Sequence, residues 1–270
     1  MIFKDRTHKK DKKMNPIIGV LLFFVSILLL IISGPLGLIY GLFYNLFKKG
    51  FRGVGEYALK MAISIDQLGN VTMQHLLNLI WLKRGAYRFG NRDETISSAI
   101  GRNKKLGLLN GFGIKIDRFL DLLDPDHSLN SIDYYIEPTD QIVDKIAWIE
   151  VVDGRILMIK WDNNDHYQLP TVQREIDDSD AQTLSKMAKD QLGIKIIEAT
   201  IKSIGIFESP ASSKDLGIIE RKKCYEAKFT GELTPSAGIH ELVWLNFQDR
   251  QMVAKKDRNI LDFLNEKGVF

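Results

Sequence analysis

The segment LPTVQREIDDSDAQTLSKMAKDQLGI, residues 169–194, decides the fold of the C-terminal half of this chain. Within it, residues 180–192 predict an amphipathic helix, because apolar residues recur at helical spacing. This apolar stripe consists of Leu184, Ala188 and Leu192. Ser179 is a suitable N-cap, and Gly193 is a suitable helix end. The segment therefore predicts an acidic loop that leads into a helix packed against other elements.

Strand patterns surround this loop and helix. Residues 146–152 and 155–161 flank Asp153-Gly154, which is a strong hairpin signal. The other expected elements are a short strand at 167–170, strands at 195–208, 219–230 and 241–247, and a final helix at 257–267. This order predicts an α+β fold with a mixed sheet. We expect its core to include Trp148, Trp161, Cys224 and Trp244, and we expect His166 and His240 to lie at the surface.

The N-terminal region predicts a membrane element. Residues 16–47 contain no charged residue, and as a helix they would measure about 48 Å, more than the ~30 Å of bilayer hydrocarbon. Gly34-Pro35 divides this run, since proline disfavours the continuation of a straight helix. Two geometries stay open, namely one span followed by an interfacial or tilted helix, or a short re-entrant hairpin with both ends on one side. A cleaved signal peptide is less favoured because the apolar run is long.

The net charge of +3 is unevenly distributed. Residues 1–60 carry ten Lys or Arg and three acids, so the rest of the chain, with 27 basic and 31 acidic residues, sums to −4. A basic end beside an apolar run indicates an anionic membrane surface rather than nucleic acid. Basic residues on both flanks of the run slightly favour the hairpin, with both flanks in the cytoplasm. A single cysteine allows no intrachain disulfide and favours a reducing compartment.

The middle of the chain predicts a small helical region. Helices are expected at 54–83 and 114–123, and Asn91 with Glu94 fits the capping box of a short helix that Gly101 would close. A polar or metal-binding cluster is one interpretation of Asp66, Asp93, Glu94 and His127. Capping and turn roles are favoured, because no pair has a close metal-ligand spacing. The predicted divisions are a membrane segment at 1–53, a helical region at 54–128, a linker at 129–144 and a second domain at 145–270.

Three motifs in the helical region resemble a family of small membrane-associated proteins of bacteria and prophages, for which no activity is established. They are IDQLGN at 65–70, FGNRDETISS at 89–98 and DPDH at 124–127. The resemblance covers residues 55–128. It implies a bacterial protein, and with the apolar run it predicts the inner membrane with a cytoplasmic C-terminal domain.

The order strand, loop, helix, glycine and strand in residues 140–270 resembles a Nudix domain. That family hydrolyses nucleoside diphosphates linked to another moiety. Its signature is G-x5-E-x7-R-E-U-x-E-E-x-G-U, where U is an aliphatic residue. The resemblance implies an α/β/α sandwich with a mixed sheet. Leu169-Pro170 matches the usual opening of the loop, and Gly193-Ile194 aligns the signature without a gap.

Most ligand positions of the signature are altered in this chain. The paired glutamates are Asp190 and Gln191, and the first helix glutamate is Met187. Lys186 replaces the arginine, and Asp178 replaces the loop glutamate. The other changes are Thr171 and Val172 at the two expected glycines, while Glu175 lies where members often have an acid. The resemblance implies catalytic candidates Asp178, Lys186 and Asp190, and metal ligands Asp190, Asp178 and Glu175.

These changes predict a degenerate site. Pyrophosphate cleavage needs divalent cations, usually Mg²⁺, and Met187 and Gln191 offer no carboxylate for them. We expect a membrane-anchored module that binds a nucleotide-like ligand or a protein partner, with Mg²⁺ only if the domain is active. One alternative is an active hydrolase that uses Asp178, Asp190 and a later acid such as Glu208. Another is a structural prophage or membrane-assembly protein. One Mg²⁺ could be held weakly by Asp177, Asp178, Asp180 and Asp190, but an acidic loop at a helix N-terminus is also a normal capping arrangement, and capping is favoured.

Overall fold

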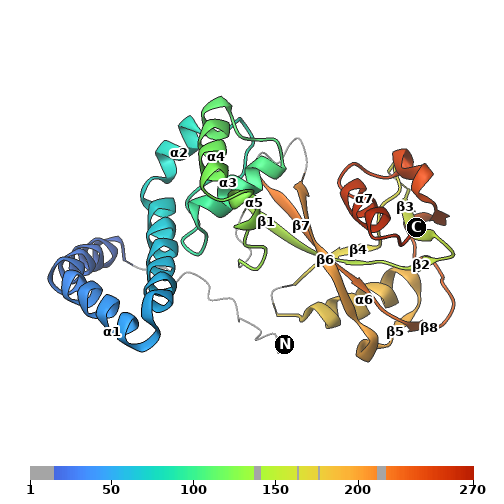
Figure 1. Ribbon diagram of the computed structural model, residues 1–270. Coiled ribbons are helices and arrows are strands. Elements are labelled where there is room, and N and C mark those ends of the chain that lie inside the picture. Colours follow the sequence, from blue (N-terminus) through green and yellow to red (C-terminus); the bar gives the residue numbers. More distant parts are fainter. Residues whose placement is uncertain (1–14, 137–140, 163, 176, 212–216) are drawn as a thin grey trace.

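A computed structural model gives the fold of the chain and describes residues 15–136, 141–162, 164–175, 177–211 and 217–270. The first half is helical (Figure 1), with α1 (Pro16–Thr72), α2 (Gln74–Ile80), α3 (Ile96–Lys105), α4 (Gly111–Leu123) and α5 (His127–Asn130). The second half holds the strands together with α6 (Asp180–Leu192) and α7 (Arg258–Glu266). The expected fold class, with an apolar N-terminal helix and a mixed sheet, is confirmed.

Two sheets and two covering helices form the C-terminal domain. The mixed sheet has the order β4 (Thr171–Gln173), β1 (Ile142–Trp148), β7 (Ile219–Glu226) and β6 (Lys202–Pro210), and only β1 and β7 run parallel. The second sheet is antiparallel, with β2 (Val151–Val152), β3 (Arg155–Trp161) and β9 (Ile239–Leu245). A short pair, β5 (Lys195–Ile196) with β8 (Phe229–Thr230), completes the strands of the described residues.

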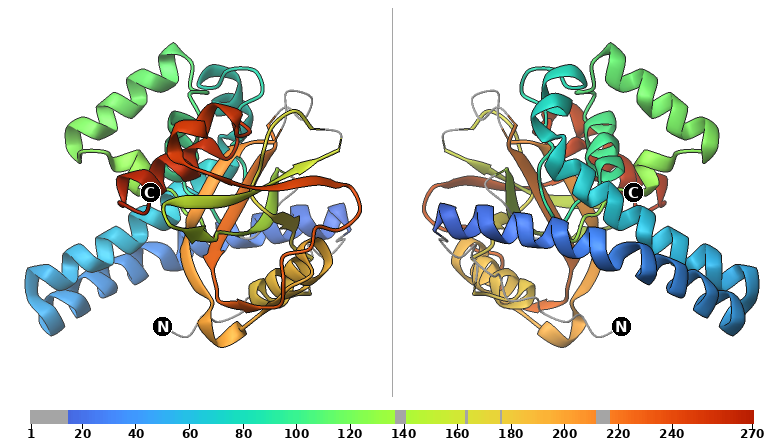
Figure 2. Two further views of the ribbon diagram at one scale, coloured as in Figure 1. Left: turned by 90° about the vertical axis from the view of Figure 1, so that its right-hand side faces the viewer. Right: turned by 90° about the vertical axis from the view of Figure 1, so that its left-hand side faces the viewer.

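Helices α6 and α7 cover opposite faces of the sheets, as Figure 2 shows. Successive side chains of a strand point to opposite faces. Ile146 and Trp148 of β1 accordingly pack in the core beneath α6, and Ala147 packs in the core beneath α7. This arrangement is the expected α/β/α sandwich. The hairpin at Asp153-Gly154 also forms, and both residues have positive φ, 50° and 70°, as a tight β-turn of the I′ type requires.

Some expected details differ in the structure. The strand expected at residues 167–170 does not form. Tyr167 and Gln168 make only isolated bridges, with Val253 and Ile159, and the regular strand β4 begins at Thr171. Cys224 and Trp148 are fully buried as expected, but Trp244 is 37% exposed. Trp244 is one of the exposed residues of β9, so its interpretation as a core residue is wrong.

Helix α1 bends at Gly50 and not at Gly34-Pro35. Gly50 has φ 64° and ψ −154°, a combination that residues with a side chain rarely adopt, and Pro35 lies inside the helix. Proline removes one backbone donor but does not force the chain to reverse, whereas the conformation of Gly50 does. The expected division at residues 34–35 is therefore wrong. We call residues 16–49 the first arm and residues 51–72 the second arm.

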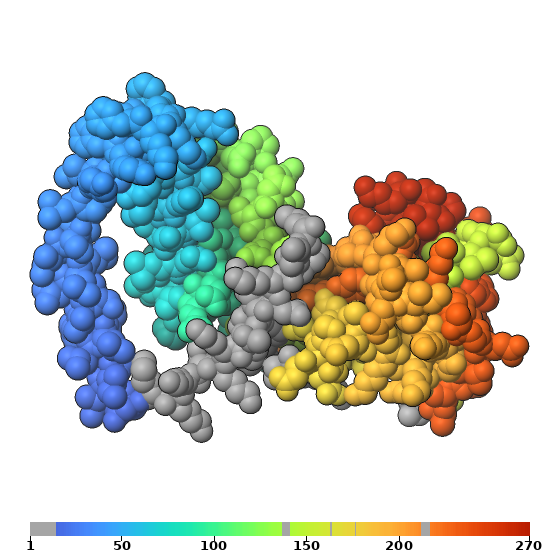
Figure 3. Space-filling view, turned by 90° about the horizontal axis from the view of Figure 1, so that it is seen from below, coloured from blue at the N-terminus to red at the C-terminus, as the bar shows by residue number. Residues whose placement is uncertain are grey.

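The two arms form a helical hairpin, which Figure 3 shows standing apart from the C-terminal domain. The ring of Tyr57 lies over Gly41, where an added Cβ would come within 2.5 Å of it. Near the bend, Lys49 and Glu56 form an ion pair of 2.7 Å. Close packing at a glycine and a charge pair at the tip therefore hold the arms together.

Helices α2 to α5 and their connections, residues 73–136, form a unit that we call the helical unit. Its core contains Tyr87, Phe89 and Ile100, and it also takes in Ile142 of β1 and Ile219 of β7. The helical unit and the sheet therefore share one hydrophobic core. The second arm joins the same unit, because the buried amide of Asn70 donates to the carbonyl oxygens of Asn91 and Glu94.

Helix α3 begins and ends at other residues than the sequence predicts. Thr95 is its N-cap and accepts a hydrogen bond from the backbone N–H of Ser98, so the Asn91 capping box does not form. Gly101 lies inside α3, where an added Cβ would come within 1.9 Å of the carbonyl oxygen of Ser128. Gly101 thus permits the close approach of α3 and α5 and does not end the helix.

Candidate functional site

The segment that resembles the Nudix signature forms a strand, a loop and helix α6. Ser179 caps the helix in a capping box with Gln182, and Gly193 ends it with φ 68°. The predicted stripe is buried, with Leu184, Ala188 and Leu192 all fully inaccessible. The caps and the apolar stripe of α6 therefore have the structural roles that the sequence predicts. The ligand positions of the signature have changed in character.

Met187 lies in the hydrophobic core. It is 2% exposed and packs in the cluster that contains Ile146, Trp148 and Leu184. In the family signature this position is a glutamate. A carboxylate at this point would lose its hydration, and no compensating cation is part of the cluster. Residue 187 of this chain therefore contributes to packing and presents no ligand atom to solvent.

Gln191 connects α6 to the loop that precedes it. Its Nε2 donates a hydrogen bond to the carbonyl oxygen of Thr171 in β4 at 3.1 Å. A glutamate could not make this bond, because an ionised carboxylate has no hydrogen to donate. The glutamate-to-glutamine replacement thus changes this position from an anionic ligand to a structural hydrogen bond.

The remaining candidate residues lie in the more open part of the segment. Asp190 is exposed and Asp178 is half-buried. Lys186 and Glu175 are both largely exposed and lie 3.5 Å apart, so their ion pair is weak. Across the described ranges, no three His, Cys, Asp or Glu side chains are grouped so that they could hold a metal ion. This donor set does not fit a bound Mg²⁺, which prefers several hard oxygen ligands in octahedral geometry.

Asp180 at the start of α6 is bound to the sheet. Tyr225 donates its hydroxyl to Asp180 Oδ2 at 2.6 Å, and Lys223 and Arg174 lie at 3.3 and 3.4 Å. Burial and the Asp180 carboxylate raise the pKa of Tyr225, so it stays a donor. This carboxylate therefore fixes the helix start to β7, which agrees with the structural role expected for Asp180.

Glu208 of β6, the acid proposed as a relocated ligand, is buried beneath the helical unit. Its carboxylate pairs with the guanidinium of Arg102 in α3. Arg102 also pairs with Glu94 at 3.1 Å, and Tyr87 donates to Glu94 at 2.6 Å. All these groups are buried. Glu208 therefore belongs to a charge network between the helical unit and the sheet, with its oxygen directed at Arg102.

A second buried charge network lies on the α7 face. Lys222 pairs with Asp257 and also with Glu220 at 3.0 Å, and Glu220 pairs further with Lys145 at 2.6 Å and Lys256 at 3.5 Å. Burial alone would raise the pKa of Glu220, but the three lysines outweigh it and lower this pKa to about 2. Sequence reasoning missed this network. Its only signal is the charged run ERKK at 220–223 inside a strand.

The four candidate residues of the helical region do not form one cluster. Asp66 accepts from the backbone N–H of Ile96 and from the hydroxyl of Ser97, at the start of α3. The other three form separate ion pairs, Asp93 with Arg92, Glu94 with Arg102, and His127 with Asp124 at 3.0 Å. Asp66 thus has the capping role that the sequence favoured, whereas Asp93, Glu94 and His127 form ion pairs that it did not predict.

Comparison with known proteins connects the C-terminal half to solved structures only. No protein-family model matches the chain, and the search of curated proteins finds no match either. The E. coli ORF135 protein is similar with 21% identity and a TM-score of 0.40, over 48% of this chain and 94% of that one. The MutT NUDIX hydrolase of Burkholderia pseudomallei is similar with 20% identity and a TM-score of 0.41, over 46% and 99%. The MutT protein of Methanosarcina mazei has 10% identity and a TM-score of 0.41, over 49% and 99%.

Proposed function

We propose that this chain is a membrane-anchored protein whose Nudix-like C-terminal domain does not hydrolyse nucleotides and acts by binding. The observation that carries the proposal is the burial of Met187 in the core beneath α6. Together with the Gln191 hydrogen bond to Thr171, it removes two of the three ligand positions of the helix. Three candidate carboxylates remain, Asp178, Asp190 and Glu175, and in the described part of the chain they are not grouped so that they could hold Mg²⁺ together.

The Nudix-like assignment rests on the chain itself. Leu169 opens the loop and is fully buried, helix α6 has both predicted caps, and Gly193 has the left-handed conformation of the signature glycine. The retained elements explain why the scaffold folds. The same fold supports many functions, so the altered ligand positions and not the scaffold decide the chemistry.

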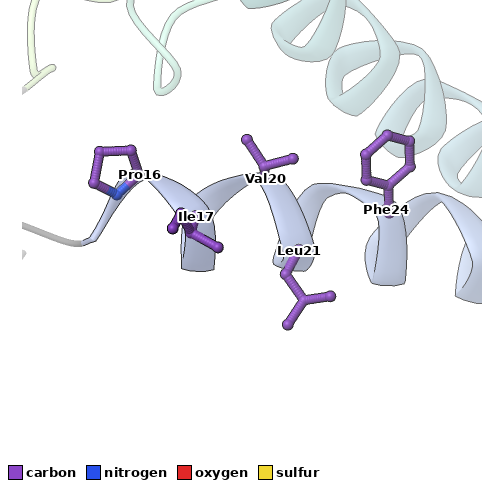
Figure 4. Close-up of a pocket in the computed structure, with 5 residues that line it drawn as sticks. All are labelled: Pro16, Ile17, Val20, Leu21 and Phe24. Atoms are coloured by element: carbon purple, nitrogen blue, oxygen red, sulfur yellow. The ribbon is translucent and has the colours of Figure 1, made fainter.

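The membrane anchor rests on the exposed apolar surface of α1. This helix is long and apolar enough to cross a membrane, and none of its most apolar 18-residue window is buried. Figure 4 shows that Val20 and Phe24 project from one side of the first arm and Leu21 from the other. An apolar helix with all sides exposed is stable in lipid but not in water.

The bend at Gly50 favours the hairpin with both ends on one side, and the charged tip, where Lys49 pairs with Glu56, has to lie outside the hydrocarbon because charges are costly there. The bend turns the second arm back along the first arm towards the helical unit, so we propose that the start of the first arm and the C-terminal domain lie on the same side of the membrane. We propose that this side is the cytoplasm of a bacterial cell. A C-terminal reporter that is active only in the cytoplasm should give signal, and signal only from a periplasmic reporter would reject this orientation.

The bound partner is a nucleotide-like molecule or a protein, and Met187 favours the protein. A packed thioether has no hydrogen-bond donor or charge to offer a phosphate. Thermal unfolding of the full chain with a panel of nucleoside diphosphate derivatives tests the nucleotide-like ligand. An unchanged unfolding temperature excludes these ligands and leaves a protein partner or a purely structural prophage role. A rise that grows with ligand concentration indicates a nucleotide-like ligand.

An active hydrolase with relocated ligands is less well supported. It would need Glu208 or another later acid near Asp190. The Glu208 carboxylate is paired with Arg102 beneath the helical unit. Withdrawing it would leave the buried guanidinium with one partner fewer, a costly change for a fully desolvated charge.

A further inference from the structure

Helix α4 of the helical unit carries an apolar face that is largely exposed to solvent. Phe119 is 58% exposed, Leu122 81% and Leu123 70%. Phe112, about two helical turns before Phe119, is also exposed. At 3.6 residues per turn these four side chains lie on one side of the helix. Side chains this large and this exposed in a row mark a surface that contacts another apolar phase.

The acidic and the basic residues of α4 lie on different sides of the helix. Both acids, Asp117 and Asp121, bind Lys104 of α3 at 3.0 and 2.8 Å, on the side that faces the helical unit. Both cations, Lys115 and Arg118, are exposed. The outward side of α4 therefore combines apolar residues with positive charge and no carboxylate of its own helix, the composition of a helix that lies on an anionic bilayer.

The exposed apolar surface continues towards the hairpin. Helix α2 follows the second arm after one residue, and its Leu76 and Leu79 are 56% and 78% exposed. Asn110, the N-cap of α4, fixes α4 to the end of α2 through the carbonyl oxygens of Ile80 and Trp81, at 2.8 and 2.9 Å. The second arm is thus followed directly by α2, to which α4 is hydrogen-bonded. Figure 1 shows α2 and α4 together at the end of the arm.

We propose that α4, with the adjoining face of α2, lies on the surface of the anionic membrane that the hairpin enters. This inference rests on the proposed membrane anchor and adds a second contact, which would fix the orientation of the C-terminal domain. A second copy of the chain fits the same face less well, because a two-fold contact would bring Lys115 and Arg118 close to their own copies.

Fluorescent labels on single introduced cysteines test the contact in the full chain. The native Cys224 is fully buried, so the unsubstituted chain gives the labelling background. The variants are Phe119→Cys and Leu122→Cys in α4, Leu28→Cys in the first arm, and Lys195→Cys, which is exposed on β5 far from α4 in Figure 1. Each labelled chain is reconstituted in phosphatidylcholine vesicles with phosphatidylglycerol, and quenching by a lipid-attached nitroxide is measured.

We expect quenching at residues 28, 119 and 122, and none at residue 195. Quenching at residue 28 alone would overturn this inference and leave the anchor intact. Quenching at none of them would reject the anchor as well. Charge reversal by Lys115→Glu with Arg118→Glu should lower the quenching at 119 severalfold but not at 28, and omission of phosphatidylglycerol should do the same. The matched control, Lys195→Glu with Lys228→Glu, should change neither, and a loss equal to that of the α4 pair would contradict the proposal.

Discussion

The side-chain amide of Gln191 in α6 donates a hydrogen bond to the carbonyl oxygen of Thr171 in β4, across 3.1 Å. The bond joins the last turn of the helix to the strand that opens the loop, so it closes the segment on itself. In a catalytic Nudix-type helix this position presents a carboxylate to a cation. Here it stabilises the segment, and the predictions below follow from that exchange of roles.

Gln191→Glu should destabilise the fold. The variant removes the donor and places a carboxylate beside a carbonyl oxygen, which costs about 1–3 kcal/mol. The measurement is the free energy of unfolding from denaturant titration. Asp190→Asn is the control on the neighbouring exposed residue and should stay within roughly 0.5 kcal/mol of the parent chain. Equal effects of the two substitutions would show that the Thr171 bond contributes nothing.

Met187→Glu should destabilise the domain more strongly, while Met187→Leu should cost less than about 1.5 kcal/mol. The glutamate would be buried without a cation, so its folded-state pKa would rise above its unfolded value. The lost stability should therefore be partly regained as pH falls through that raised pKa. A stable Met187→Glu chain with no pH dependence would mean that residue 187 reaches solvent.

Arg102→Met should be costly because it leaves Glu94 and Glu208 buried without their cation. Breaking a buried pair from one side costs about 3–5 kcal/mol. Burial already raises the pKa of Glu208 against the opposing effect of Arg102, so removing Arg102 should raise this pKa further. Lys202→Ala, which removes the exposed pair with Glu226, is the comparison and should cost less than about 1 kcal/mol. Similar losses for the two variants would contradict the network.

Acid unfolding should reveal how much the ionised Glu220 contributes to stability. The three lysines that surround it lower its pKa to about 2, below the ordinary value of 4.5. A carboxylate with a lowered pKa contributes stability that is complete above pH 4.5 and is lost as pH falls towards 2. Glu220→Gln should therefore be less stable than the parent chain near neutral pH, and the difference should shrink across this window. A difference that is independent of pH would exclude ionisation of Glu220 as its cause.

Gly50→Ala should disturb the hairpin. Alanine at φ 64° and ψ −154° is strained by about 1–3 kcal/mol, whereas Gly55→Ala introduces a Cβ that meets no atom within 4 Å. Thermal unfolding in detergent, followed by far-UV circular dichroism, should give a lower midpoint for Gly50→Ala and an equal or higher one for Gly55→Ala. The reverse order would place the bend elsewhere.

Local patterns predicted the parts of the fold that depend on neighbouring residues. Helix α6, its caps at Ser179 and Gly193, and the hairpin at Asp153-Gly154 follow from spacing and turn chemistry within a few residues. The pairing of Arg102 with Glu208 joins residues 106 positions apart, and no local pattern contains it. The bend at Gly50 was missed because a proline is the stronger signal in sequence, although only the glycine adopts the reversing conformation.

Within the candidate site, the sequence identified the altered positions but not what the substitutes do. Met187 could have lined a pocket or entered the core, and only the packing of α6 against β1 decides for the core. Gln191 could have bound a ligand, and only the position of Thr171 gives its amide a partner. Both outcomes depend on tertiary contacts, which a single helical pattern does not specify.

The most direct test of the central proposal is a turnover measurement on the purified full chain. Nucleoside diphosphate derivatives are incubated with Mg²⁺ or Mn²⁺, and the release of phosphate and of nucleoside monophosphate is recorded. We predict no release above the rate without protein, with either metal and with every substrate. Metal-dependent release that disappears in Asp190→Ala would contradict the account, because it would show that the remaining carboxylates still form a working site.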